Sequence, residues 1–207
     1  MIKTIVYICC LLTLNLVGAQ KIVKKSILNP DTSFIQIDAN ESYQLDMVTT
    51  NTDELIVEAI IDGEYKNDLL LNTIQDGQTV LISTSFRPGF VSPNDKLSAH
   101  KVISIALKVK IPKNKNIKVY GLSCNVSVMG TYKNLNITLE DGQCILNEVE
   151  GAVEVNTYSG AIKVYNAKAH INATSKYGVV YKETVLQDKN YYKLSSVTGN
   201  IYLRKTE

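Results

Sequence analysis

The chain has 207 residues, of which 22 are Lys or Arg and 20 are Asp or Glu, so its formal net charge is +2. A charge this close to zero argues against an electrostatic grip on nucleic acid. The length is sufficient for a substantial core in one large domain or two small ones.

Residues 1–19 have the features of a secretory signal peptide. A single positive charge at Lys3 precedes an apolar stretch from Ile5 to Leu16, and Gly18 and Ala19 follow it. We expect cleavage before Gln20 and export to the periplasm, the outer-membrane surface or the extracellular space. The apolar run is shorter than the ~20 residues of a transmembrane helix, and we expect no span in the mature chain.

Residues 20–116 are predicted to form a β-rich N-terminal portion. Four segments are rich in β-branched residues and partly alternate between apolar and polar positions. They are SFIQID (33–38), ELIVEAII (54–61), TVLISTS (79–85) and KVISIALKVKI (101–111). Turn sequences such as Asp62-Gly63 and Asp76-Gly77 separate them, and no helical pattern follows residue 19.

A long irregular stretch at 86–100 contains Asp95, Ser98 and His100. An acid, a hydroxyl and an imidazole so close together suggest a catalytic triad. However, triad residues normally converge from separate segments onto an oxyanion site, and the Gly-x-Ser-x-Gly elbow is missing. The sequence therefore indicates that this stretch is a loop that closes a strand crossing, rather than a catalytic site.

From Ile117 onward the sequence repeats every nine residues. Residues at this spacing form an apolar column, and a second apolar column starts two residues later at Val119. The residue between the two columns is polar in six of eight units. Alternation with period two indicates short, half-buried strands. The first column comprises Ile117, Val126, Leu135, Cys144, Val153, Ile162, Ile171 and Val180.

Glycine stands two positions before four of these eight strand units, at Gly142, Gly151, Gly160 and Gly178. It supplies a turn conformation closed to other residues, or lets two backbones approach closely. A repeated turn, glycine and strand predict an all-β fold with a β-solenoid at 117–207, continuous with 20–116 as one domain. An antiparallel β meander or sandwich is the alternative, although hairpin signals of the Asn-Gly kind are absent.

The spacing changes after Val180. The next apolar pair, Tyr192 and Leu194, begins twelve residues later, and Ile201 and Leu203 repeat it. We expect an irregular terminal unit that covers the open end of the core and protects its edge.

Two cysteines, Cys124 and Cys144, follow the predicted signal peptide. An exported protein permits a disulfide. Coils of eighteen residues would nevertheless offset these cysteines by two positions on neighbouring strands, ~7–8 Å apart, which exceeds comfortable bridging distance. We expect two buried free thiols, with the disulfide as the alternative.

The repeat offers candidates for binding rather than catalysis. Cys-x-x-Cys, His-x-x-x-His and calcium-loop patterns are absent, so we expect no catalytic residues, metal or cofactor. Exposed tyrosines can stack against sugar rings or contact partner proteins. The candidate binding surface comprises Tyr158, Tyr165, Tyr177, Asn136, Glu154, Lys163 and Asn172.

Several segments resemble the secreted putative adhesin family of Bacteroidetes-type bacteria. They are PNDKLSAHKV, NVSVMGTYKNLNITLEDGQCILNEVEG, GAVEVNTYSGAIKVYNA and YGVVYKE. The resemblance covers roughly 27–203 and implies a right-handed single-stranded β-solenoid, as in autotransporter adhesin heads and related domains of unknown function. The family has no agreed catalytic residues, so the resemblance assigns none here.

Together these observations predict an exported, non-enzymatic, adhesin-like or cell-envelope protein that presents an extended β surface to polysaccharide or protein partners. One alternative is a polysaccharide-active β-helix enzyme. Such an enzyme would need clustered acids with Arg or Lys, and the chain contains only two arginines, Arg87 and Arg204. The other is a structural protein that self-associates through an open sheet edge.

Overall fold

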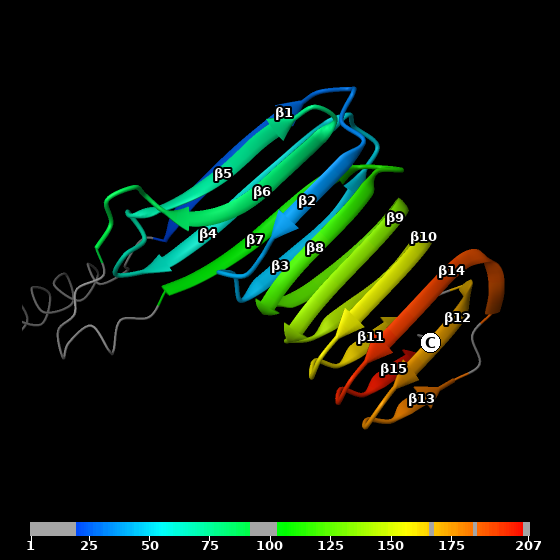
Figure 1. The fold of residues 1–207 in the computed structure, drawn as a ribbon. Coiled ribbons are helices and arrows are strands. Elements are labelled where there is room, and N and C mark those ends of the chain that lie inside the picture. Colours follow the sequence, from blue (N-terminus) through cyan, green and yellow to red (C-terminus); the bar gives the residue numbers. More distant parts are fainter. Residues whose placement is uncertain (1–19, 92–102, 166–167, 184–185, 205–207) are drawn as a thin grey trace, which may run out of the picture.

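The computed structural model describes residues 20–91, 103–165, 168–183 and 186–204 (Figure 1). Within these ranges the regular elements are fifteen β-strands in one mixed sheet that does not close on itself. The all-β prediction is thus confirmed. The predicted signal peptide and Asp95, Ser98 and His100 lie outside the described residues. Within them, no helix has the length and apolar character to cross a membrane.

The sheet folds into two layers because two long strands run through both. β9 (Asn125–Asp141) pairs first with β3 (Gln44–Thr50) and then with β8 (Asn116–Ser123). β10 (Cys144–Thr157) follows β9 through the same bend, and its register shifts there. Gly130 and Gly151 stand at the bends with φ of 111° and 118°, values that favour glycine.

Each layer has a definite strand order (Figure 1). Layer A runs β1 (Lys21–Leu28), β4 (Glu54–Gly63), β7 (Ile103–Pro112), β3, the starts of β9 and β10, β11 (Ile162–Tyr165), β15 (Ile201–Arg204) and β13 (Val180–Lys182). Layer B runs β5 (Leu69–Asp76), β6 (Thr79–Phe86), β2 (Phe34–Asp38), β8, the ends of β9 and β10, β14 (Leu186–Ser196) and β12 (Lys168–Ser175). Pairing is antiparallel for β1–β4, β4–β7 and β5–β6, and parallel elsewhere.

The first strands of the repeat pair with an offset of eighteen residues, which equals two nine-residue units. In layer A, Cys144 lies opposite both Val126 and Ile162. In layer B, Leu135 lies opposite both Ile117 and Val153. Successive units therefore alternate between the layers. The antiparallel alternative is wrong for this half of the chain, because its described strands pair in parallel.

One hydrophobic core lies between the layers. Inward positions from both portions of the chain belong to it, and Leu45, Val119 and Leu146 are fully buried. Cys124 and Cys144 are also fully buried and free, as expected.

Tyr132 and Tyr192 are buried as well. The Tyr132 hydroxyl donates to the Met129 carbonyl at 3.1 Å, and that of Tyr192 donates to the Val149 carbonyl. A hydrogen-bonded hydroxyl is what allows a tyrosine ring to fill a core position.

The last two strands of the chain lie inside the stack, and the prediction that they cover its end is wrong. β14 pairs with β10 on one side and β12 on the other, while β15 lies between β11 and β13. Tyr192 and Ile201 are consequently fully buried, whereas Ile171 and Val180 on the outer strands stay partly exposed. β14 and β15 carry larger apolar side chains than β12 and β13 and occupy the inner positions, because burial of apolar area stabilises the fold.

Glycines form a column at one turn of the stack, where neighbouring connections meet. A Cβ on Gly160 would lie 1.6 Å from the Gly142 carbonyl oxygen, and one on Gly199 would lie 2.2 Å from that of Gly160. No side chain fits at such distances, so backbone proximity explains why glycine recurs here. In spatial order the column is Gly142, Gly160, Gly199 and Gly178.

Candidate binding surface

The outward side of layer B is an extended surface on which residues of successive strands line up in rows. The central row crosses six strands and consists of Gln36, Lys118, Asn136, Glu154, Lys193 and Asn172. Neighbouring strands lie about 4.8 Å apart, so polar groups recur along the row at about this interval.

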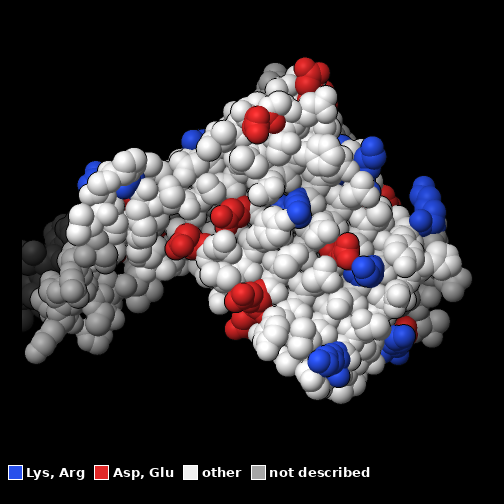
Figure 2. Space-filling model, in the orientation of Figure 1, with Lys and Arg blue, Asp and Glu red and all other residues white. Residues whose placement is uncertain are grey.

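Two further rows flank the central one. On one side lie Phe34, Asn116, Asn134, Ala152, Tyr191 and His170. On the other lie Asp38, Tyr120, Thr138, Asn156, Ser195 and Thr174. We call the three rows the layer B face. Amides, hydroxyls and aromatic rings dominate it, and its few charges are scattered (Figure 2).

Hydrogen bonds between rungs hold several of these side chains in place. Lys193 Nζ lies 2.9 Å from Glu154 Oε1, and Asn136 Nδ2 donates to Glu154 Oε2 at 3.4 Å. The hydrogen bond and positive charge of Lys193 lower the pKa of Glu154. In the adjacent row Asn134 Nδ2 donates to Asn116 Oδ1 at 2.7 Å. Such cross-strand contacts restrict rotamers and so prearrange the surface for a ligand.

The seven predicted binding residues fall in three places. Asn136, Glu154 and Asn172 lie together in the central row of the layer B face. Lys163 and Tyr165 occupy outward positions of β11, on the opposite layer. Tyr158 and Tyr177, which are 60% and 70% exposed, lie on the turns beside the glycine column.

Hydroxyl side chains shape those turns. Ser196 Oγ accepts a hydrogen bond from the Gly199 amide at 2.9 Å, and Ser175 Oγ accepts one from the Gly178 amide at 3.0 Å. In the third copy, Thr157 Oγ1 donates to the Gly160 carbonyl at 2.7 Å. The sequence signal is Ser or Thr three residues before Gly, a pattern that the glycine spacing alone did not reveal.

Lys193 is a component of the face that the nine-residue pattern missed. It lies on β14, beyond the change in spacing, and it meets Glu154 because β14 is inserted next to β10. The separation of 39 residues is not a multiple of the repeat. Only the strand order reveals this contact.

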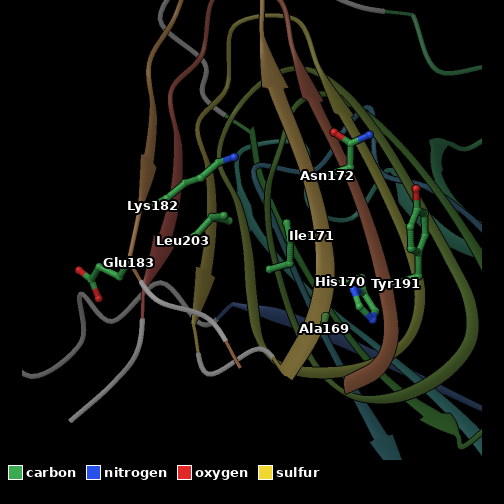
Figure 3. A pocket seen from close by; sticks show the side chains of 8 residues that line it. All are labelled: Ala169, His170, Ile171, Asn172, Lys182, Glu183, Tyr191 and Leu203. Atoms are coloured by element: carbon green, nitrogen blue, oxygen red, sulfur yellow. The ribbon is translucent and has the colours of Figure 1, made fainter. Parts of the chain in front are cut away.

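The open end of the stack contains a shallow hollow between the outermost strands of the two layers (Figure 3). Ile171 and Leu203 point into it, and its lining also includes Ala169, His170, Asn172, Lys182, Glu183 and Tyr191. Glu183 points away from His170. The hollow therefore does not bring an acid and a base together as hydrolytic catalysis requires.

The two thiols are buried and hold their protons more tightly than an exposed cysteine does. Burial raises the pKa of both Cys124 and Cys144 to about 12, and the negative charge of Asp46 adds to the effect at Cys124. The thiolate, which is the nucleophile and metal ligand, is therefore scarce at neutral pH. Across the described ranges, no group of three or more His, Cys, Asp or Glu residues is arranged to hold a metal ion.

Comparison with solved structures shows a likeness in fold. A putative cell adhesion protein from Clostridium sporogenes matches with a TM-score of 0.65 and 16% identity, covering 91% of this chain and 100% of that one. Putative adhesins from Bacteroides fragilis and Parabacteroides distasonis match with TM-scores of 0.41 and 0.38 and identities of 11% and 12%; each match covers 90% of this chain and 98% of the other. No family model matches the chain, and no curated protein matches its sequence.

Proposed function

We propose that this chain is an exported, non-enzymatic, adhesin-like protein of the cell envelope, and that its layer B face binds polysaccharide. The observation that carries this proposal is the strand-to-strand repetition of amides and hydroxyls across the face. A polysaccharide also repeats, so a chain lying across the strands can make the same weak contact several times. Linked weak contacts produce useful affinity together.

The proposed architecture is a right-handed β-solenoid in which 20–116 and 117–207 form one domain behind a signal peptide at 1–19. The eighteen-residue parallel register supports a repeating coil. The β2–β8 and β3–β9 pairings and the shared core support a single domain. The fold likeness to a clostridial protein named a putative cell adhesion protein supports an adhesin-like role.

A binding role fits the chemistry of the face better than hydrolysis does. Glycoside hydrolysis typically uses two carboxyl groups, one of them protonated to serve as the acid. Glu154 is paired with Lys193, which lowers its pKa and keeps it ionised at neutral pH. The other carboxylate of the face, Asp38, lies on β2, three strands away in layer B.

The proposal is tested by screening the protein on an array of bacterial and host polysaccharides and measuring the affinity of variants. The double variant Asn136→Ala/Asn172→Ala removes two amides of the central row and should weaken binding about tenfold, or ~1.4 kcal/mol. The control Asn72→Ala removes an amide on β5 (Leu69–Asp76), outside the three rows, and should leave affinity unchanged.

Failure of the wild-type protein to bind any polysaccharide would contradict the proposal, as would equal affinity of the wild type and the double variant. Release of reducing ends or unsaturated products from a bound polysaccharide would establish the enzyme alternative instead.

A further inference from the structure

Layer A carries a separate cluster of aromatic and cationic side chains, formed by β11, β15 and β13 near the open end of the stack. Tyr202 lies between Lys163 and Tyr181 in one outward row. In the next row, Tyr165 lies opposite Arg204. We call these five residues the layer A cluster.

The cluster has a defined internal geometry. The Tyr181 and Tyr202 rings stack in parallel, with centroids 4.9 Å apart and an interplanar angle of 6°. The Arg204 guanidinium lies 5.5 Å from the Tyr202 centroid, and Asn200 Nδ2 lies 3.2 Å from the Tyr202 hydroxyl oxygen. These contacts hold Tyr202 from several sides, so the stack is prearranged.

Tyr181 presents a ring face to which a ligand has access. Tyr181 is 49% exposed, and β13 is the outermost described strand of layer A. Tyr202 covers one side of the ring, and no described strand covers the other. A sugar ring can stack its apolar C–H face on an accessible aromatic ring of this kind.

The charges beside the stack favour an anionic sugar. Lys163 lies opposite Tyr202, and Arg204 follows Tyr202 by two residues on the same side of β15. The carboxylate nearest in sequence is that of Glu183, and the two cations of the cluster outnumber this single carboxylate. Arginine presents a planar fork that matches a carboxylate in two parallel hydrogen bonds.

We propose that the layer A cluster is a second glycan site, specific for a polysaccharide that contains uronic acid. The pyranose ring of one sugar residue stacks on Tyr181, and the carboxylates of the following residues of the same chain bind Arg204 and Lys163. This inference rests on the proposed polysaccharide-binding function and adds a ligand class and a location on the opposite layer.

The test is isothermal titration of the full chain with oligogalacturonate and with a neutral galactose oligomer of the same length. The wild type should bind oligogalacturonate at least tenfold more tightly than the neutral oligomer. Arg204→Gln and Tyr181→Ala should each lower that affinity at least tenfold, while Tyr181→Phe, which keeps the ring, should retain it. Tyr43→Ala is the matched control, because Tyr43 is 51% exposed but lies outside the cluster.

The inference is overturned if the wild type does not bind oligogalacturonate or binds both oligomers equally. It is also overturned if Arg204→Gln keeps the wild-type affinity for oligogalacturonate or if Tyr181→Phe loses it. If Asn136→Ala/Asn172→Ala abolishes oligogalacturonate binding and Arg204→Gln does not, the layer B proposal stands and the layer A site is wrong. If the wild type binds no polysaccharide at all, both proposals are wrong.

Discussion

Gly160 illustrates how one residue sets the distance between neighbouring turns. Its Cα packs directly on the Gly142 carbonyl, and Gly199 packs on Gly160 in turn. The sequence predicted that glycine would mark each unit. It did not reveal that the glycines touch one another, because Gly199 reaches the column only through the inserted strands β14 and β15.

The substitution Gly160→Ala should therefore be strongly destabilising. The added Cβ would meet the Gly142 carbonyl oxygen at 1.6 Å and force the turns apart, which should cost about 3 kcal/mol, the upper range for overpacked sites. The matched control is Gly77→Ala, where φ is +54° but nothing lies within 4 Å of the new Cβ. Backbone strain alone should cost about 1 kcal/mol there.

Urea unfolding of the two variants measures this difference. Equal stability of Gly160→Ala and the wild type would show that the turns are not packed as closely as described.

Residues of the candidate surface were predictable where the repeat is regular. Alternation alone placed Asn136, Glu154 and Asn172 on outward positions, and they share one row. The same reasoning could not tell which layer an outward residue belongs to, because units nine residues apart face opposite sides. Lys163 and Tyr165 were therefore grouped with residues of the other layer.

At the scale of elements, the order of the last four strands decides which apolar side chains become buried. The regular spacing predicted that Ile171 and Val180 would continue the core after Val153 and Ile162. Instead, Tyr192 and Ile201 take those places. Sequence periodicity could not predict this exchange, because it reports which side of a strand is apolar and not which strand is its neighbour.

Two isoleucine substitutions test this strand order. Ile201→Ala empties a fully buried position and should cost about 2–5 kcal/mol. Ile171→Ala removes the same atoms from a partly exposed edge strand, so its cost should be about 1 kcal/mol. Chemical denaturation of both variants provides the comparison. A larger loss for Ile171→Ala than for Ile201→Ala would contradict the placing of β12 at the edge of layer B and of β15 inside layer A.

At the scale of the whole molecule, both portions of the chain contribute to the same two layers. β2 and β3 come from the N-terminal portion, yet each pairs with a strand of the repeat. Composition and alternation were sufficient to predict an all-β chain. The repeat favoured parallel pairing in 117–207. The antiparallel strands at one end of the layers were not predictable, since alternation is the same in both kinds of pairing.

The extended layer B face is the feature on which the proposed function depends. Its asparagines provide their own probes, because each side-chain amide gives a separate NMR signal that shifts when a ligand contacts it. The face contains Asn116, Asn134, Asn136, Asn156 and Asn172.

The most direct test is to titrate the labelled protein with the shortest array oligosaccharide that the wild type binds, and to follow these amide signals. We predict shifts of the asparagines of the layer B face, with the Asn72 signal on β5 unchanged. Binding that leaves the signals of the layer B face unmoved would contradict the account.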